Sequence, residues 1–259
     1  MSNAADLATL GRLKSWLIGL ILCPRTTNAM NNFLLQIRWP DLIALISLVA
    51  CFTLYAPLSN LILGGNISSR MLEWRKSWAR QMMWREERIT DVSLVRGLIG
   101  NVSFFATTTV FVISGLLALI GSSGPIVAKL NALPHFDRVS EETIIMKLST
   151  LLGMAVVAFF KFGWAMRLHA NALLMVGAAP EPAQRDSALA EYVGSSLAKM
   201  SALASLHFQG GVRAYYFGFA TLPWLFSAWL LFPSLALMIL VAIRREYFSN
   251  AFRAAMPPV

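Results

Sequence analysis

Two short stretches of this sequence combine cationic and aromatic side chains with apolar surroundings. One is the apolar segment 148–176, whose charged residues are one lysine and one arginine. The other is the run G-G-V-R-A-Y-Y-F at residues 210–217. Ammonium and guanidinium groups at the depth of the lipid head groups bind phosphates and carboxylates. The residues that we predict to contact an anion or a lipid head group are Lys161, Arg167, Arg213, Tyr215 and Tyr216.

The same charged residues also have structural interpretations. Arg213 can pair internally with an acid such as Asp91 or Glu87, with the two tyrosines as anchors in the aromatic belt of a membrane protein. A second set of polar residues lies at the ends of apolar segments, where ion pairs and hydrogen bonds hold helices together. The candidates for such structural contacts are Arg88, Asp91, His169 and His207.

Lys161 discriminates between two functional classes. It follows Leu148 by 13 residues. At a rise of about 1.5 Å per residue this is about 20 Å along a helix, which lies deep in a hydrocarbon core of about 30 Å. Its stem can reach along the helix to the interface, or its ammonium can face an internal polar cavity. Orientation toward lipid favours a scaffold, whereas a cavity shared with Arg167 favours the handling of anions.

Enzymatic signatures are missing from the sequence. It contains no nucleophile elbow, zinc-protease motif, phosphate loop or dinucleotide fingerprint. Residues 92–136, 143–180 and 192–245 contain no acid, which disfavours proton relays and cation transport. The histidines lack metal-ligand spacing, so we predict no catalytic residues, no metal and no cofactor. His169 is the one candidate for an axial haem ligand, although a hydrogen-bonded histidine near a helix end is the commoner case.

Composition and hydropathy predict an all-α, polytopic membrane protein. Hydrophobic residues make up 57% of the 259, charged residues only 14%, and the mean hydropathy is +0.60. Residues 214–243 contain no charge. Since about 20 apolar residues already cross a bilayer, we predict four transmembrane helices with amphipathic interfacial helices, the spans being 42–63, 94–121, 148–176 and 214–243. The net charge of +9 indicates anionic membrane lipids as partners rather than nucleic acid.

The chain divides into three predicted parts. Residues 1–40 form an N-terminal amphipathic extension, 41–253 the four-span membrane domain, and 254–259 a C-terminal tail. Residues 69–88 have an apolar stripe that lies on the membrane surface or docks on the protein's own spans, and 184–205 form a second amphipathic helix. Residues 122–147 are expected to be a loop or a broken surface segment. Four crossings place this loop and both termini on one side.

Two ordered motifs carry a resemblance to a known family. A basic Trp/Met segment leads through R-x-x-D to S-F-F-A-T-T-T, and G-x-R-x-Y-Y-F follows far downstream. From Asp41 to Arg253 the chain resembles the bacterial and plant membrane family called Domain of Unknown Function, number 599. The resemblance implies a multi-span topology and no chemistry. For the localisation we predict an integral protein of the bacterial inner (cell) membrane. The positions that match the motifs are Arg88, Asp91, Ser103, Phe104, Phe105, Gly211, Arg213, Tyr215 and Tyr216.

Two functions from different classes remain. The first is a non-catalytic scaffold or accessory subunit that forms a homo-oligomer or joins a larger membrane complex, based on faces of small residues and the Trp-rich helix. The second is a transporter, channel or lipid-binding protein for an anionic species, based on the cations named above. We favour the first.

Overall fold

A computed structural model describes residues 38–63, 67–132 and 140–255, and every regular element in these ranges is helical. The prediction of an all-α fold is confirmed. The α-helices are α3 (Trp39–Leu63), α4 (Ile67–Met82), α5 (Ile89–Gly121), α6 (Ser123–Asn131), α7 (Glu141–Gly177), α8 (Ala188–Ala220), α9 (Leu231–Tyr247) and α10 (Asn250–Ala254). Short 3-10 helices are η1 (Pro182–Gln184), η2 (Pro223–Leu225) and η3 (Ala228–Leu230).

Two of the predicted parts lie largely outside the described residues. Of the N-terminal extension (1–40) only residues 38–40 are described, and Trp39 already begins α3. Of the C-terminal tail (254–259) only its first two residues are described, and the last of α10 is Ala254.

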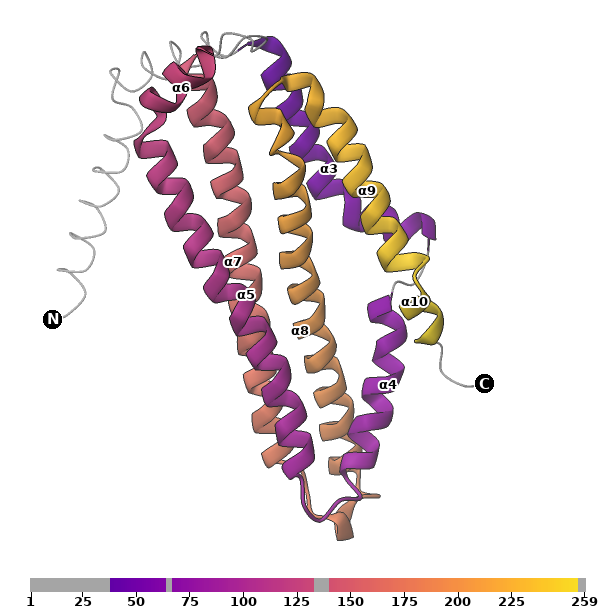
Figure 1. Cartoon of the computed structure of the whole chain (residues 1–259). Coiled ribbons are helices and arrows are strands. Elements are labelled where there is room, and N and C mark those ends of the chain that lie inside the picture. The colour runs from indigo at the N-terminus through magenta and orange to yellow at the C-terminus, as the bar shows by residue number, and fades with distance from the viewer. Residues whose placement is uncertain (1–37, 64–66, 133–139, 256–259) are drawn as a thin grey trace, which may run out of the picture.

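Three long helices, α5, α7 and α8, run side by side along the whole molecule (Figure 1). α5 and α8 contain 33 residues each and α7 contains 37 residues. At a rise of about 1.5 Å per residue, their lengths are about 50 Å to about 55 Å. Serine caps fix where two of them begin, since Ser140 accepts a hydrogen bond from the Thr143 amide and Ser187 from the Ala190 amide. These helices are longer than a hydrocarbon core of about 30 Å requires.

The shorter helices divide this long bundle into two halves (Figure 1). The membrane half contains α3, α9, the C-terminal parts of α5 and α8, and the N-terminal part of α7. The helical extension contains α4 with residues 89–100 of α5, 165–177 of α7 and 188–206 of α8. Each half has its own buried apolar cluster, one around Trp224 and Phe217 and one around Met82 and Leu197. A third cluster, around Phe162 and Ala165, straddles the boundary between the halves, and a fourth lies around Leu116 and Ile144.

Four helices in the described residues are long and apolar enough to cross a membrane, as predicted. They are Trp39–Ile62, Ile89–Gly121, Glu141–Gly177 and Ala228–Ala254. The helical extension carries exposed charged side chains on its outer surface, among them Arg96, Arg167 and Lys199. Hydrocarbon does not solvate such groups, so the apolar membrane half is the part that enters the bilayer.

The last predicted span, 214–243, is not one helix, and this prediction was wrong. α8 ends at Ala220, and α9 begins only at Leu231 after η2 and η3. Pro223 cannot continue the hydrogen bonding of α8, because a proline has no backbone N–H. The Thr221 hydroxyl donates to the Gly218 carbonyl oxygen at 2.7 Å, which closes the helix end. The uncharged stretch is therefore a hairpin of two antiparallel helices, both within the membrane half (Figure 1).

This hairpin changes the expected arrangement of the chain ends. Trp224 at its tip contacts Asp41 at the start of α3, whereas Glu246 near the end of α9 contacts Tyr55 farther along α3. The start of α3 and the end of α9 thus lie at opposite faces of the membrane half, not on one side as four crossings would place them. Within residues 122–147, for which a loop or a broken surface segment was expected, Ser123–Asn131 form α6 and Glu141 begins α7.

The basic Trp/Met segment forms α4, which packs along the N-terminal half of α8. Ala79, Met82 and Met83 are buried in the core of the helical extension, whereas Met71 and Trp74 at the other end of the predicted stripe stay exposed. Of the two interpretations, the packing shows docking onto the protein's own helices. It also places the predicted segments 69–88 and 184–205 side by side.

Candidate functional site

The hairpin brings together arginines that would lie at opposite ends of the segment if it were one straight helix. Arg213 precedes the uncharged stretch on α8, and Arg244 and Arg245 follow it on α9. Because the chain reverses between the two helices, the Arg245 guanidinium donates a hydrogen bond to the Tyr216 hydroxyl. The Nη1 atom of Arg213 lies 3.9 Å from the Oε2 atom of Glu246. The arginines thus share one face of the membrane half.

A cavity of about 500 Å³ opens at this junction of α8, α9, α10 and the start of α4. Its polar lining combines cations, hydroxyls and an amide with one carboxylate, and apolar side chains complete the wall. The lining residues are Ile67, Ser205, Phe208, Gln209, Val212, Arg213, Tyr216, Ala242, Arg245, Glu246, Ser249 and Ala251. A smaller groove of about 430 Å³ shares Arg245 and Ser249 with it and adds Arg244 and Arg253.

Arg213 has an internal acidic partner, as the structural interpretation required, but the expected partners were wrong. The acid is Glu246 rather than Asp91 or Glu87. Glu246 also accepts a hydrogen bond from the Tyr55 hydroxyl at 3.3 Å, and the Arg213 guanidinium lies 6.0 Å from the centre of the Tyr55 ring. Asp91 cannot serve because it lies near the far end of the helical extension.

We expect the pairing of Arg213 with Glu246 to contribute measurably to stability. Arg213→Met leaves the Glu246 carboxylate, which is only 13% exposed, without its cation. Because the pair is long and not fully buried, the substitution should cost about 2 kcal/mol. Adding Glu246→Gln should recover most of that loss. Thermal unfolding of the detergent-solubilised protein measures both, with the exposed Arg167→Met as the control. Equal midpoints for Arg213→Met and wild type would contradict the pairing.

The two adjacent tyrosines point to different surroundings. Tyr216 lines the cavity beside Arg245. Tyr215 lies in the core of the membrane half, where its hydroxyl is 2.7 Å from that of Thr109 and its ring packs against Phe162. Only Tyr216 is therefore placed to contact a ligand in the cavity.

Lys161 and Arg167 are not brought together into a polar path. The Lys161 side chain lies along α8 at Gly210, where a Cβ would be 3.4 Å from its Cδ. Arg167 is exposed, with its guanidinium 5.8 Å from the centre of the Trp164 ring. Neither lines the cavity at Arg213. The expected continuation of positive charge from Arg213 into the membrane is not formed.

Arg88 and Asp91 make structural contacts, although not with each other. Asp91 is buried and accepts hydrogen bonds from the Arg85 guanidinium at 2.5 Å and the Trp78 indole at 2.8 Å. Arg88 donates to the carbonyl oxygens of Ala179, at 2.7 Å, and Pro180, beyond the end of α7. These contacts close the tip of the helical extension by joining α4, α5 and the α7–α8 connection.

His169 lies inside the helical extension and His207 lies beside it. His169 is 2% exposed, and the ring of His207 packs against that of Trp164 at 6.2 Å. Within the described ranges no three His, Cys, Asp or Glu side chains gather as metal ligands.

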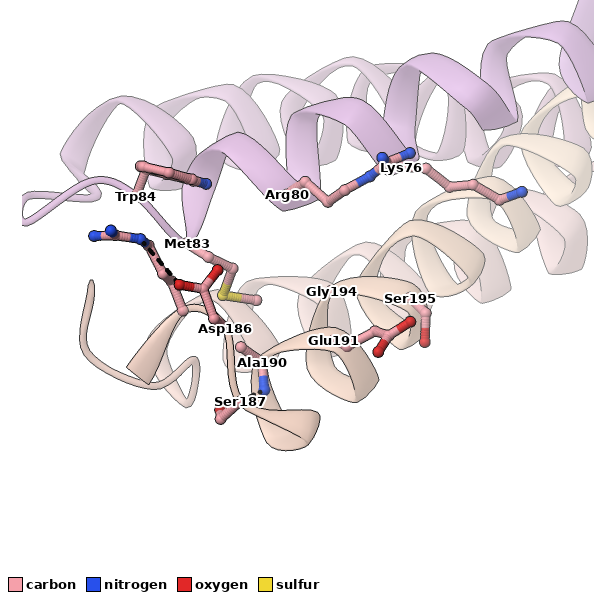
Figure 2. A pocket seen from close by; sticks show the side chains of 11 residues that line it. Lys76, Arg80, Met83, Trp84, Asp186, Ser187, Ala190, Glu191, Gly194 and Ser195 are labelled. Carbon is pink, nitrogen blue, oxygen red and sulfur yellow. Dashed lines mark hydrogen bonds and ion pairs between the residues drawn. The ribbon is translucent and has the colours of Figure 1, made fainter. Parts of the chain in front are cut away.

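A second pocket of about 490 Å³ lies at the far end of the helical extension, between α4 and the start of α8 (Figure 2). Its charges largely neutralise one another. Arg185 lies 3.6 Å from Asp186 and stacks over Trp84 at 4.1 Å, and Lys76 pairs with Glu73 at 2.8 Å. This pocket is less suited to a small anion than the cavity at Arg213.

Among the described residues, the ion pair with both partners most buried was not predicted from the sequence. The Lys147 ammonium lies 3.0 Å from the Oδ1 atom of Asp41, and that oxygen accepts from the Trp224 indole at 2.8 Å. Lys147 also donates to the Trp224 carbonyl oxygen at 2.9 Å. The Lys147 and Asp41 side chains are 3% and 4% exposed, and Trp224 is fully buried. The only signal in the sequence was an acid and a lysine at the starts of apolar helices, with nothing to pair them.

These features define a multi-pass helical membrane protein, with four helices in the described residues that are long and apolar enough to cross a bilayer. The chain belongs to the family described as protein of unknown function, DUF599, which matches residues 42–251. The resemblance seen in the motifs is thereby confirmed. No curated protein and no solved structure matches the chain.

Proposed function

We propose that this protein is a non-catalytic scaffold or accessory subunit that self-associates or joins a larger assembly in the bacterial inner (cell) membrane. The observation that carries the proposal is the helical extension. Three membrane helices continue into it without a break, and it presents exposed apolar side chains where no hydrocarbon covers them. Exposed apolar surface outside the bilayer is typical of protein–protein contact.

The outer face of α8 has the clearest such surface. Leu189, Tyr192, Leu203 and Leu206 are 56%, 70%, 48% and 41% exposed. Their spacings of three, eleven and three residues place them on one stripe of the helix, as at the contact positions of paired helices. The stripe faces away from the core of the helical extension.

The handling of an anion through the membrane has less support. It required Lys161 to share a polar cavity with Arg167, and Lys161 instead lies against Gly210 of α8 while Arg167 lies on the outer surface. The acid-free segments of the sequence also disfavour ion-coupled transport.

We expect Leu203→Gln combined with Leu206→Gln to dissociate the assembly. Losing two exposed leucines from a contact removes apolar burial of about 1.5 kcal/mol or more each, enough to weaken association by at least about tenfold. Cross-linking in native membranes, followed by sizing in mild detergent, measures the complex. The control is Leu94→Gln combined with Leu174→Gln on α5 and α7. A wild-type chain that stays monomeric in both measurements would refute the scaffold.

A further inference from the structure

The cavity at Arg213 and the groove beside it form one cationic surface, made of Arg213, Arg244, Arg245 and Arg253. Among the residues that line the cavity or the groove, Glu246 is the one acid. It already accepts a hydrogen bond from Tyr55 and pairs with Arg213. Counting these side chains alone, four cations stand against one anion. Such a surface attracts an anionic ligand.

The depth of this surface is set by the hairpin. Arg213 and Arg244 bound the uncharged residues 214–243, and α8 and α9 carry them back to the same face of the membrane half. On both helices the arginines are therefore the first charged residues beyond the apolar region. In a bilayer this is the level of the phosphate groups.

The walls suit an amphiphile as well as an anion. The arginines, together with the hydroxyl groups of Ser205, Tyr216 and Ser249, provide hydrogen-bond donors for phosphate oxygens. Val241 on α9 and Phe248 directly after it line the groove beside Arg244 and Arg245, and both side chains are exposed. An acyl chain can follow this apolar face of α9 into the bilayer while its head group stays among the arginines.

We propose that this surface binds the head group of an anionic phospholipid. The phosphate lies among Arg244, Arg245 and Arg253, and the rest of the head group enters the cavity beside Tyr216. Arg213 remains paired with Glu246. It contributes to the electrostatic potential at the site and does not contact the phosphate directly. This site goes beyond the proposed scaffold role, since it needs no protein partner.

The test compares Arg244→Gln combined with Arg253→Gln against wild type in full-length protein. Short-chain phosphatidylglycerol and phosphatidylcholine are titrated into the detergent-solubilised protein, and binding is measured by native mass spectrometry and by the shift in thermal midpoint. Each arginine near an anionic surface contributes about fivefold in affinity, so the double variant should bind phosphatidylglycerol roughly thirtyfold more weakly. Phosphatidylcholine binding should be weak and unchanged.

Arg96→Gln on α5 is the matched control, because that arginine is exposed on the helical extension and lines neither cavity. It should bind like wild type. Equal affinity of the wild type for the two lipids would overturn the proposal, and so would unchanged binding in the double variant. An equal thermal shift from inorganic phosphate would assign the site to a soluble anion instead. Arg253→Gln alone, on the exposed α10, decides the matter if the double variant does not fold.

Discussion

Replacing Lys147 with methionine should lower the thermal midpoint of the detergent-solubilised protein by about 10 °C. The substitution leaves the Asp41 carboxylate, in a residue that is 3% exposed, without its cation. An uncompensated buried charge costs about 3 kcal/mol to about 5 kcal/mol. The substitution also removes the donor to the Trp224 carbonyl oxygen. Three elements lose their common contact at once, namely α3, α7 and η2.

A second substitution distinguishes the buried charge from lost packing. In Lys147→Met combined with Asp41→Asn, the amide oxygen still accepts from the Trp224 indole and no charge remains, so most of the midpoint should return. Lys129→Met on α6 is the matched control, because that lysine is exposed. If the double variant were as unstable as Lys147→Met, the loss would come from packing and not from the ion pair.

Gly211→Ala should destabilise the membrane half although it adds a single methyl group. A Cβ at this position would lie 2.4 Å from Cε1 of Phe162, inside the distance that atoms tolerate. The Phe162 ring is fully buried and packs against the rings of Phe105, Phe208 and Tyr215, so it has no free space to enter. Overpacking of a filled core costs about 1 kcal/mol to about 3 kcal/mol, and we expect the upper end of this range.

Compensation tests the cause of that effect. Combining Gly211→Ala with Phe162→Leu removes the ring atoms that the new methyl group meets, and the thermal midpoint should rise above that of Gly211→Ala alone. Gly97→Ala is the control, because nothing lies within 4 Å of a Cβ there. Alanine at that position also favours a helix by up to about 1 kcal/mol. A Gly211→Ala protein as stable as Gly97→Ala would show that α7 and α8 do not approach so closely.

The patterns of hydropathy and charge correctly predicted the structural features that depend on local sequence. The all-α class and the four apolar helices follow from uncharged runs, and the involvement of Arg88 and Asp91 in polar contacts follows from their place at helix ends. The hairpin was missed because residues 214–243 are apolar throughout and long enough for one crossing. Pro223 was the available signal, since a proline after an α-helix often marks its end.

Contacts between distant segments could not be predicted from local patterns. Nothing near Arg213 in the sequence indicates Glu246, because the two meet only after the hairpin has reversed the chain. The docking of α4 onto α8 also depends on contacts between distant segments. Its apolar stripe suits a membrane surface and a protein surface equally well and can meet both at once, and the docking onto α8 is evident only from the packing of Met82.

The buried contact at the hairpin tip has a consequence for biosynthesis. Asp41 leaves the ribosome early, but its indole partner Trp224 is 183 residues farther along the chain. Until that residue is made, α3 carries an acid without its full set of partners. The tip that must reach it contains no charge, so its translocation moves no ion through hydrocarbon. Arrival of the tip supplies the indole donor, so a chain truncated before Trp224 leaves Asp41 without this hydrogen bond.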